Sequence, residues 1–199
     1  MRLVKPSYEI VEQQPGINGI YRAIEYAGRI CYKSSDKITE DSAKPFVDRM
    51  INSGHGAMLE FGTVYLKINL PVVDIEDSVY LGNWLADFYY KNKYSKINYI
   101  NNILYITTNL RVIIENNRLE DLSYYLCEPT EYHEKRVAVK FICDRGVSHE
   151  LVRHRVFSFA QESTRFCNYS RDKFGNEITY VIPSWCDLEE GKYSWVGFN

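Results

Sequence analysis

The chain has 199 residues, of which 45% are hydrophobic, and this length predicts one domain over residues 1–199 with a substantial core. A formal net charge of -2 disfavours a broad basic surface for nucleic acid, and no apolar run reaches the roughly 18 residues that span a bilayer. Five scattered cysteines without a CxxC pair, and a first segment without an apolar signal region, predict a cytoplasmic protein with reduced thiols.

The first seventy residues predict two strands and two helices. An opening strand is expected over Arg2–Glu12, and a helix capped by Asn18 over residues 19–31. A second helix is expected to start near Thr39 and to stop at Gly54. Apolar and polar residues then alternate along Phe61–Leu70, which predicts a strand with one buried face.

The rest of the chain predicts more helix, then two further strands. Residues 72–128 are expected to form a largely helical insertion with a short strand-like piece at Leu104–Thr107. Further strands are expected over Arg136–Asp144 and Asn176–Ile182. The predicted fold class is therefore α+β, with a mixed or antiparallel sheet flanked by helices.

One stretch, Asp144–Phe166, concentrates charge in an otherwise mildly acidic chain. It holds four arginines, two of the four histidines and several hydroxyl residues. Guanidinium groups beside hydroxyls suit phosphate, because the planar fork offers paired donors to paired oxygens. A helix is expected from Val147 to Arg155, with Ser148 as its cap. Gly146 separates this helix from the preceding predicted strand.

The arginines of this stretch cannot all serve one ligand atom from one helix. Arg153 and Arg155 would point about 200° apart on a continuous helix. Either the helix ends there, or the two side chains serve different ligands or sites. The ordinary alternative is a solvated charged helix, in which Glu150 pairs with Arg153 and His154.

Arg153-His154-Arg155, followed after seven residues by Ser163, resembles the signature of the flavin-dependent thymidylate synthases. A second segment, Gly54–Phe61, resembles the part of that family in which a histidine and a glutamate lead into a strand. A weaker resemblance covers Ala23–Tyr32, in the helix that opens the family's fold.

The resemblance implies a function: methylation of dUMP to dTMP, with methylenetetrahydrofolate as one-carbon donor, FAD as cofactor and NADPH as reductant. It also implies a homotetramer with sites between subunits. The residues that would contact FAD are His55, Ala57, Glu60, Arg153, His154, Arg155 and Gln161. Those that would contact dUMP are Glu150, Arg153, Gln161, Glu162, Ser163, Thr164 and Arg165, with Ser163 binding rather than attacking.

The chain also departs from the family. Ala160-Gln161 replaces a common Asn-Glu, and Phe166 replaces a frequent tyrosine. The family continues into C-terminal helices that this chain is expected to lack, and an arginine thought to polarise the uracil ring would lie beyond Asn199. The alternative is therefore a catalytically impaired relative that binds FAD or nucleotide. A metal hydrolase is disfavoured, because His149 and His154 are poorly spaced and have no carboxylate cluster beside them.

Overall fold

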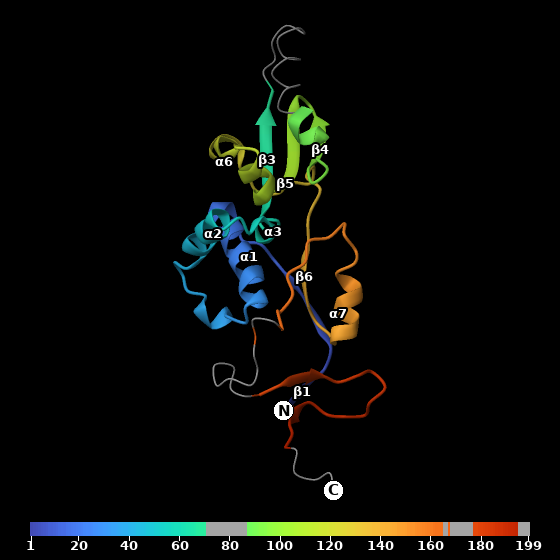
Figure 1. Cartoon of the computed structure of the whole chain (residues 1–199). Coiled ribbons are helices and arrows are strands. Elements are labelled where there is room, and N and C mark those ends of the chain that lie inside the picture. The colour runs from blue at the N-terminus through green and yellow to red at the C-terminus, as the bar shows by residue number, and fades with distance from the viewer. Residues whose placement is uncertain (71–86, 165–166, 168–176, 195–199) are drawn as a thin grey trace. The chain divides into compact units, whose positions relative to one another are not determined.

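The computed structural model describes residues 1–70, 87–164, 167 and 177–194, and its helices and short strands give an α+β fold, as predicted (Figure 1). The chain forms two compact units. The signature unit comprises residues 1–12, 29–35 and 137–199, and the core unit comprises residues 13–28 and 36–136. Helix α1 contributes to both units.

The helices of the core unit bury the faces that the sequence predicts, but they begin at other residues. Helix α1 spans Gly16–Cys31, so Asn18 lies inside it rather than capping it. Gly16 has a φ of 71°, a value open to glycine, and this lets the chain turn into the helix earlier than predicted. The buried residues of α1 include Ile20, Ile24 and Ala27.

Helix α2 spans Ala43–Asn52, four residues later than the predicted start at Thr39. Ser42 explains the delay, because its hydroxyl accepts a hydrogen bond from the Thr39 amide and donates one to Glu25 (both 2.8 Å). Phe46, Val47 and Met50 are buried, as expected. Before α2, a short 3-10 helix, η1, spans Ser35–Lys37.

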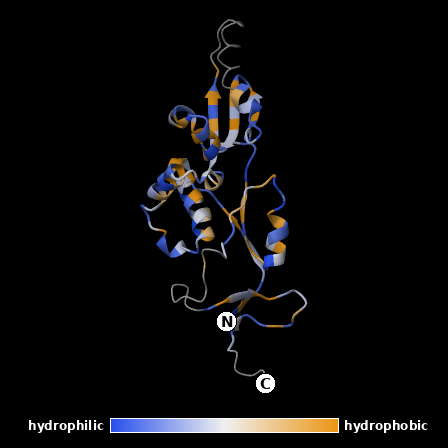
Figure 2. Ribbon diagram, viewed as in Figure 1, coloured by the Kyte–Doolittle hydropathy of each residue, from blue (hydrophilic) through white to orange (hydrophobic). Residues whose placement is uncertain are grey.

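The central element of the core unit is an antiparallel sheet in the order β3-β5-β4. Strand β3 spans Thr63–Asn69, and its apolar and polar residues alternate as predicted (Figure 2). Strand β5, Ile103–Asn109, is buried at every position from its second residue onward. The core of the unit forms where α1 and α2 pack with this sheet.

The segment predicted to be largely helical contains more strand than the sequence suggests. Strand β4, Lys96–Ile100, pairs with β5 as a hairpin. Asn101 and Asn102 have φ values of 50° and 60°, and two such residues match the right-handed twist of paired strands. Helices α5 (Leu110–Glu115) and α6 (Leu119–Tyr125) follow, and residues 87–91 are helical. Residues 72–86, the first part of the predicted helical insertion, lie outside the described residues.

A buried histidine fastens the segment that follows α6 to β3. His133 is 5% exposed, and its Nε2 lies 3.1 Å from the carbonyl oxygen of Leu66. Its Nδ1 accepts from the Thr130 amide at 3.0 Å, which leaves the ring proton on Nε2 for the Leu66 carbonyl. Both nitrogens are used by the neutral ring, and burial lowers the pKa of His133 below its ordinary value of 6.5.

The stability of the core unit should therefore fall in mild acid. Below about pH 6.5 the unfolded chain binds a proton at His133 before the folded chain does, so the free energy of unfolding decreases by up to ~1.4 kcal/mol per pH unit until the folded pKa is reached. Urea unfolding at about pH 7.5 and about pH 5.5 measures this slope. His133→Gln should reduce this pH dependence. The other three histidines are the same in both proteins, so their contribution does not affect the comparison. Equal slopes in both proteins would contradict the prediction.

The signature unit contains two small sheets. Strand β1 (Arg2–Val4) lies between β7 (Thr179–Val181), which is parallel to it, and β8 (Gly191–Lys192), which is antiparallel. Strand β2 (Ser7–Val11) pairs antiparallel with β6 (Ala138–Ile142). The predicted opening strand is thus two strands, interrupted at Pro6, which has no N–H for a ladder.

The β2–β6 pair leaves large apolar side chains exposed. Tyr8 and Phe141 face each other in the register and are 73% and 54% exposed, and Ile10 is 64% exposed. Two strands alone bury little apolar surface and are marginally stable in water. Within the described parts of the chain, no helix is long and apolar enough to cross a membrane.

Candidate functional site

The arginine-rich stretch begins with a short helix that an aspartate caps. Helix α7 spans Arg145–Leu151, and the Asp144 carboxylate accepts a hydrogen bond from the Val147 amide at 3.1 Å. The predicted cap, Ser148, instead lies inside the helix and donates to the Arg145 carbonyl at 3.1 Å. Asp144 is the better cap because its carboxylate also carries a negative charge toward the positive end of the helix. The N-terminus of α7 is therefore occupied by the protein's own carboxylate.

The helix ends before the two arginines that were predicted to diverge. Arg153 and His154 continue from α7 in a turn, in which their amides donate to the Glu150 and Leu151 carbonyls at 3.1 Å. Of the two alternatives left open by the sequence, the ending of the helix is the one observed. All residues from 152 to 157 are exposed. The Arg153-His154-Arg155 turn therefore presents its cationic groups at the surface of the unit.

One of these cationic groups has a partner on α7. Arg153 Nη1 lies 3.1 Å from Glu150 Oε1 and 3.2 Å from Oε2, which confirms the predicted pair. The two side chains are 72% and 67% exposed, and a pair this exposed contributes little to stability. An anionic ligand can therefore compete with Glu150 for the guanidinium at small cost.

The segment that follows the turn is held against α7 and the end of α1. Gln161 donates to the Ser148 hydroxyl at 2.7 Å, and Arg145 donates to the Thr164 hydroxyl at 3.1 Å. The Ser163 amide donates to the Cys31 carbonyl at 3.0 Å. The structure thus places three residues predicted to contact nucleotide in one folded segment. Arg165 lies outside the described residues.

Two residues near the end of α1 support this segment without having been predicted to do so. Cys31 supplies the carbonyl that holds Ser163, and Lys33 Nζ lies 3.9 Å from Glu162 Oε1. Lys33 has a φ of 45°, an uncommon value for a residue with a side chain. The sequence shows that Lys33 is a basic residue just after the first predicted helix. It does not show which distant segment the Lys33 side chain approaches.

The remaining predicted residues lie in the core unit, around the four-residue helix α3 (Gly56–Leu59). His55 precedes α3, and its carbonyl accepts from the Met58 amide at 3.3 Å. His55 and Ala57 are exposed. Glu60 directly follows α3, and its carboxylate accepts from Arg111 Nη1 at 2.7 Å. The predicted order of histidine, glutamate and strand is confirmed, because β3 begins at Thr63.

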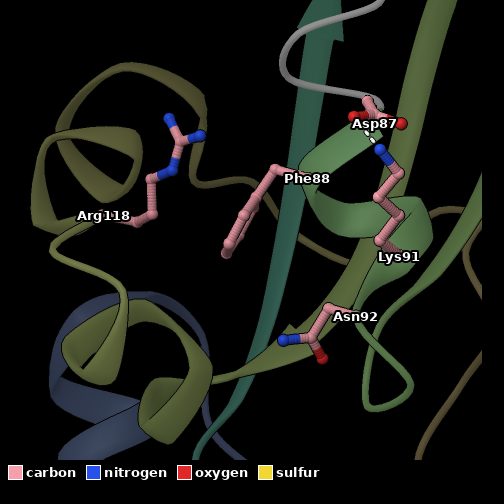
Figure 3. Close-up of a pocket in the computed structure, with 5 residues that line it drawn as sticks. All are labelled: Asp87, Phe88, Lys91, Asn92 and Arg118. Carbon is pink, nitrogen blue, oxygen red and sulfur yellow. Dashed lines mark hydrogen bonds and ion pairs between the residues drawn. The ribbon is translucent and has the colours of Figure 1, made fainter.

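The core unit also contains an open pocket of about 400 Å³ lined by Asp87, Phe88, Lys91, Asn92 and Arg118 (Figure 3). The Arg118 guanidinium lies 4.6 Å from the centre of the Phe88 ring. Lys91 Nζ lies 2.6 Å from Asp87 Oδ2, and both side chains of this pair are exposed. Among the described residues, none of those predicted to bind FAD or dUMP lines this pocket.

In a comparison with protein families, residues 129–195 match the family described as thymidylate synthase complementing protein. The matched range includes α7, the Arg153-His154-Arg155 turn and the segment through Ser163. It does not include His55 or Glu60. No curated protein and no solved structure matches the chain. The match confirms the resemblance carried by the signature: residues 129–195 of this chain are similar to the thymidylate synthase complementing protein family.

Proposed function

We propose that this protein takes part in the flavin-dependent synthesis of thymidylate, in which dUMP is methylated to dTMP. Methylenetetrahydrofolate is the one-carbon donor and NADPH the reductant. The observation that carries the proposal is the exposed Arg153-His154-Arg155 turn, within a segment that matches the family. Arginine and histidine at one exposed turn provide the charge and the donors that an anionic cofactor requires.

The donor chemistry of this turn fits FAD. Arg153, His154 and Arg155 are all exposed, and a pyrophosphate accepts hydrogen bonds from groups of this kind. When bound, FAD supplies the hydride chemistry of the reaction. In the proposal Arg153, His154 and Arg155 bind the cofactor, and Gln161 contributes an uncharged amide beside them.

The segment after the turn is proposed to bind dUMP. Glu150, Arg153 and Gln161 would begin this site, and Glu162, Ser163, Thr164 and Arg165 would complete it. Ser163 is proposed as a binding group rather than a nucleophile. Its amide is already engaged with the Cys31 carbonyl, so the backbone bond that fixes the segment leaves the hydroxyl for ligand contact. The Arg145–Thr164 hydrogen bond supports the same segment from α7.

The core unit is proposed to contribute His55, Ala57 and Glu60 to the FAD site. Gly56 lies between two of these residues at the start of α3, where a Cβ would lie 3.1 Å from both Arg111 Nε and Glu115 Oε1. A glycine between His55 and Ala57 thus allows the backbone to approach a charged group closely. Both flanking residues are exposed and available to a ligand.

The protein is further proposed to be a homo-oligomer, with a tetramer expected and with sites shared between subunits. Helix α7 has no buried residue, and the β2–β6 pair exposes Tyr8, Ile10 and Phe141. Val156 and Phe157, within the exposed turn itself, are 87% and 66% exposed. Apolar groups beside cationic groups favour a site that is closed by another protein surface.

The proposal is tested by titrating purified protein with FAD, recording the flavin absorption spectrum, and then adding dUMP. Saturable flavin binding and a spectral change with dUMP are the expected results. Conversion of dUMP to dTMP with methylenetetrahydrofolate and NADPH then tests catalysis. Binding without turnover would favour the alternative of an impaired relative. Protein that binds neither FAD nor dUMP would overturn the proposal.

A further inference from the structure

Arg111 is a residue of the core unit to which the sequence assigned no role, and it joins two glutamates. Its Nη1 lies 2.7 Å from Glu60 Oε1, and its Nε lies 2.7 Å from Glu115 Oε1. The Glu115 contact is local, at four residues along α5. The Glu60 contact links α5 to the end of α3 across 51 positions of sequence.

The backbone around Arg111 is held in place by the buried residues of α5 and by hydrogen bonds at the start of this helix. Leu110, Val112 and Ile113 are at most 3% exposed. Asn109 caps the helix by accepting from the Val112 amide at 3.1 Å, and the Leu110 amide donates to the Gly62 carbonyl at 2.9 Å. This last bond ties the start of α5 to the chain just past Glu60. Only the guanidinium end of Arg111 is left to adjust.

The guanidinium lies against the same short segment in two places. It binds Glu60 after α3, and it lies beside Gly56 at the start of α3, where an added Cβ would be 3.1 Å from Arg111 Nε. Gly56 follows His55 directly, so the segment that holds His55, Ala57 and Glu60 is in contact with one arginine. Glu60 is 22% exposed at its side chain and Arg111 38%, so the pair is partly shielded from water.

We infer that Arg111 is a positioning residue for the FAD site: its 2.7 Å contact with Glu60 orients this carboxylate for contact with the cofactor. The inference rests on the proposed function, because it requires Glu60 to be a cofactor contact. A purely structural ion pair would stabilise the core unit without any specific link to FAD affinity. The two roles therefore differ in one measurable respect: only a positioning role makes the effect of Arg111 on FAD affinity depend on Glu60.

A double-mutant cycle in FAD affinity separates them. Arg111→Met should weaken FAD binding about tenfold, because the Glu60 carboxylate loses its 2.7 Å contact with Arg111 and samples more rotamers. Glu60→Gln should weaken it by a similar factor. In the Glu60→Gln background, Arg111→Met should then have almost no further effect. Arg111→Lys should recover part of the loss, since an ammonium can reach one of the two glutamates but lacks the fork that joins both.

Arg118→Met is the matched control, because Arg118 is an arginine of the same unit that contacts Phe88. It should leave FAD affinity unchanged. Urea unfolding of each variant confirms that the measured protein is folded. If the losses from Arg111→Met and Glu60→Gln multiply in the double variant while the wild type binds FAD, the positioning role is overturned and the proposed function stands. If the wild type binds no FAD, both are overturned.

Discussion

Replacing Arg155 with methionine should weaken FAD binding about a hundredfold and leave the thermal midpoint unchanged. Arg155 is exposed, and within the described residues its guanidinium has no hydrogen bond or ion pair, so its removal costs the free protein nothing. The loss appears only with the cofactor, because a guanidinium fork on phosphate oxygens forms two charge-assisted hydrogen bonds. Flavin titration and differential scanning calorimetry measure the two quantities.

Arg22→Met is the control, because Arg22 is an exposed arginine on α1, outside the signature.

Arg155→Met should also have a larger effect on FAD affinity than Arg153→Met when measured on dUMP-free protein, since Arg153 is partly neutralised by Glu150. Increasing salt should reduce the difference between wild type and Arg155→Met, as expected for an exposed charge. Equal FAD affinity in Arg155→Met, Arg22→Met and the wild type would remove Arg155 from the site.

Gly28→Ala should destabilise the core unit by about 2 kcal/mol, although alanine is the better helix former by about 1 kcal/mol. A Cβ at Gly28 would lie 2.4 Å from Phe46 Cζ and 2.7 Å from its Cε1, closer than atoms can pack. Phe46 is 3% exposed and enclosed by the core, so its ring cannot move away freely. The free energy of unfolding in urea gives the size and the sign of the effect.

Phe46→Leu provides the test of the cause. Leucine removes the far atoms of the ring, so Phe46→Leu in the Gly28→Ala background should cost less than it does in the wild type. The two changes should therefore compensate in a double-mutant cycle. A stabilising Gly28→Ala would show that helix propensity dominates at this position, and strictly additive effects would show that the ring is not the obstacle.

Elements with a regular pattern could be predicted from the sequence. Strand β3 has one buried face, so its hydrophobic residues alternate, and the prediction differs from the structure only at the ends. Strand β5 is covered on both faces, and its sequence Ile-Leu-Tyr-Ile-Thr-Thr-Asn shows no alternation. Its Asn101-Asn102 turn also lacks the glycine that usually marks a hairpin. The missing glycine explains why the hairpin, and with it β4, was not predicted.

The local part of the candidate site could also be predicted, and the tertiary part could not. The pair of Glu150 and Arg153 follows from helical spacing. The choice of Asp144 over Ser148 as the cap does not, because both residue types cap helices well. The contact between Arg111 and Glu60 depends on how α5 and α3 pack, and spacing in the sequence carries no information about it.

The two-residue turn at Asn101-Asn102 has a consequence for the order of folding. Strands β4 and β5 are joined by a very short loop, so their pairing has a low entropic barrier and can form early. Strand β3 must reach β5 across the much longer segment 70–102, and its association should follow. Because doubling such a connection adds only about 0.6 kcal/mol of closure entropy, evolution can lengthen or shorten the chain between β3 and β4 with little penalty.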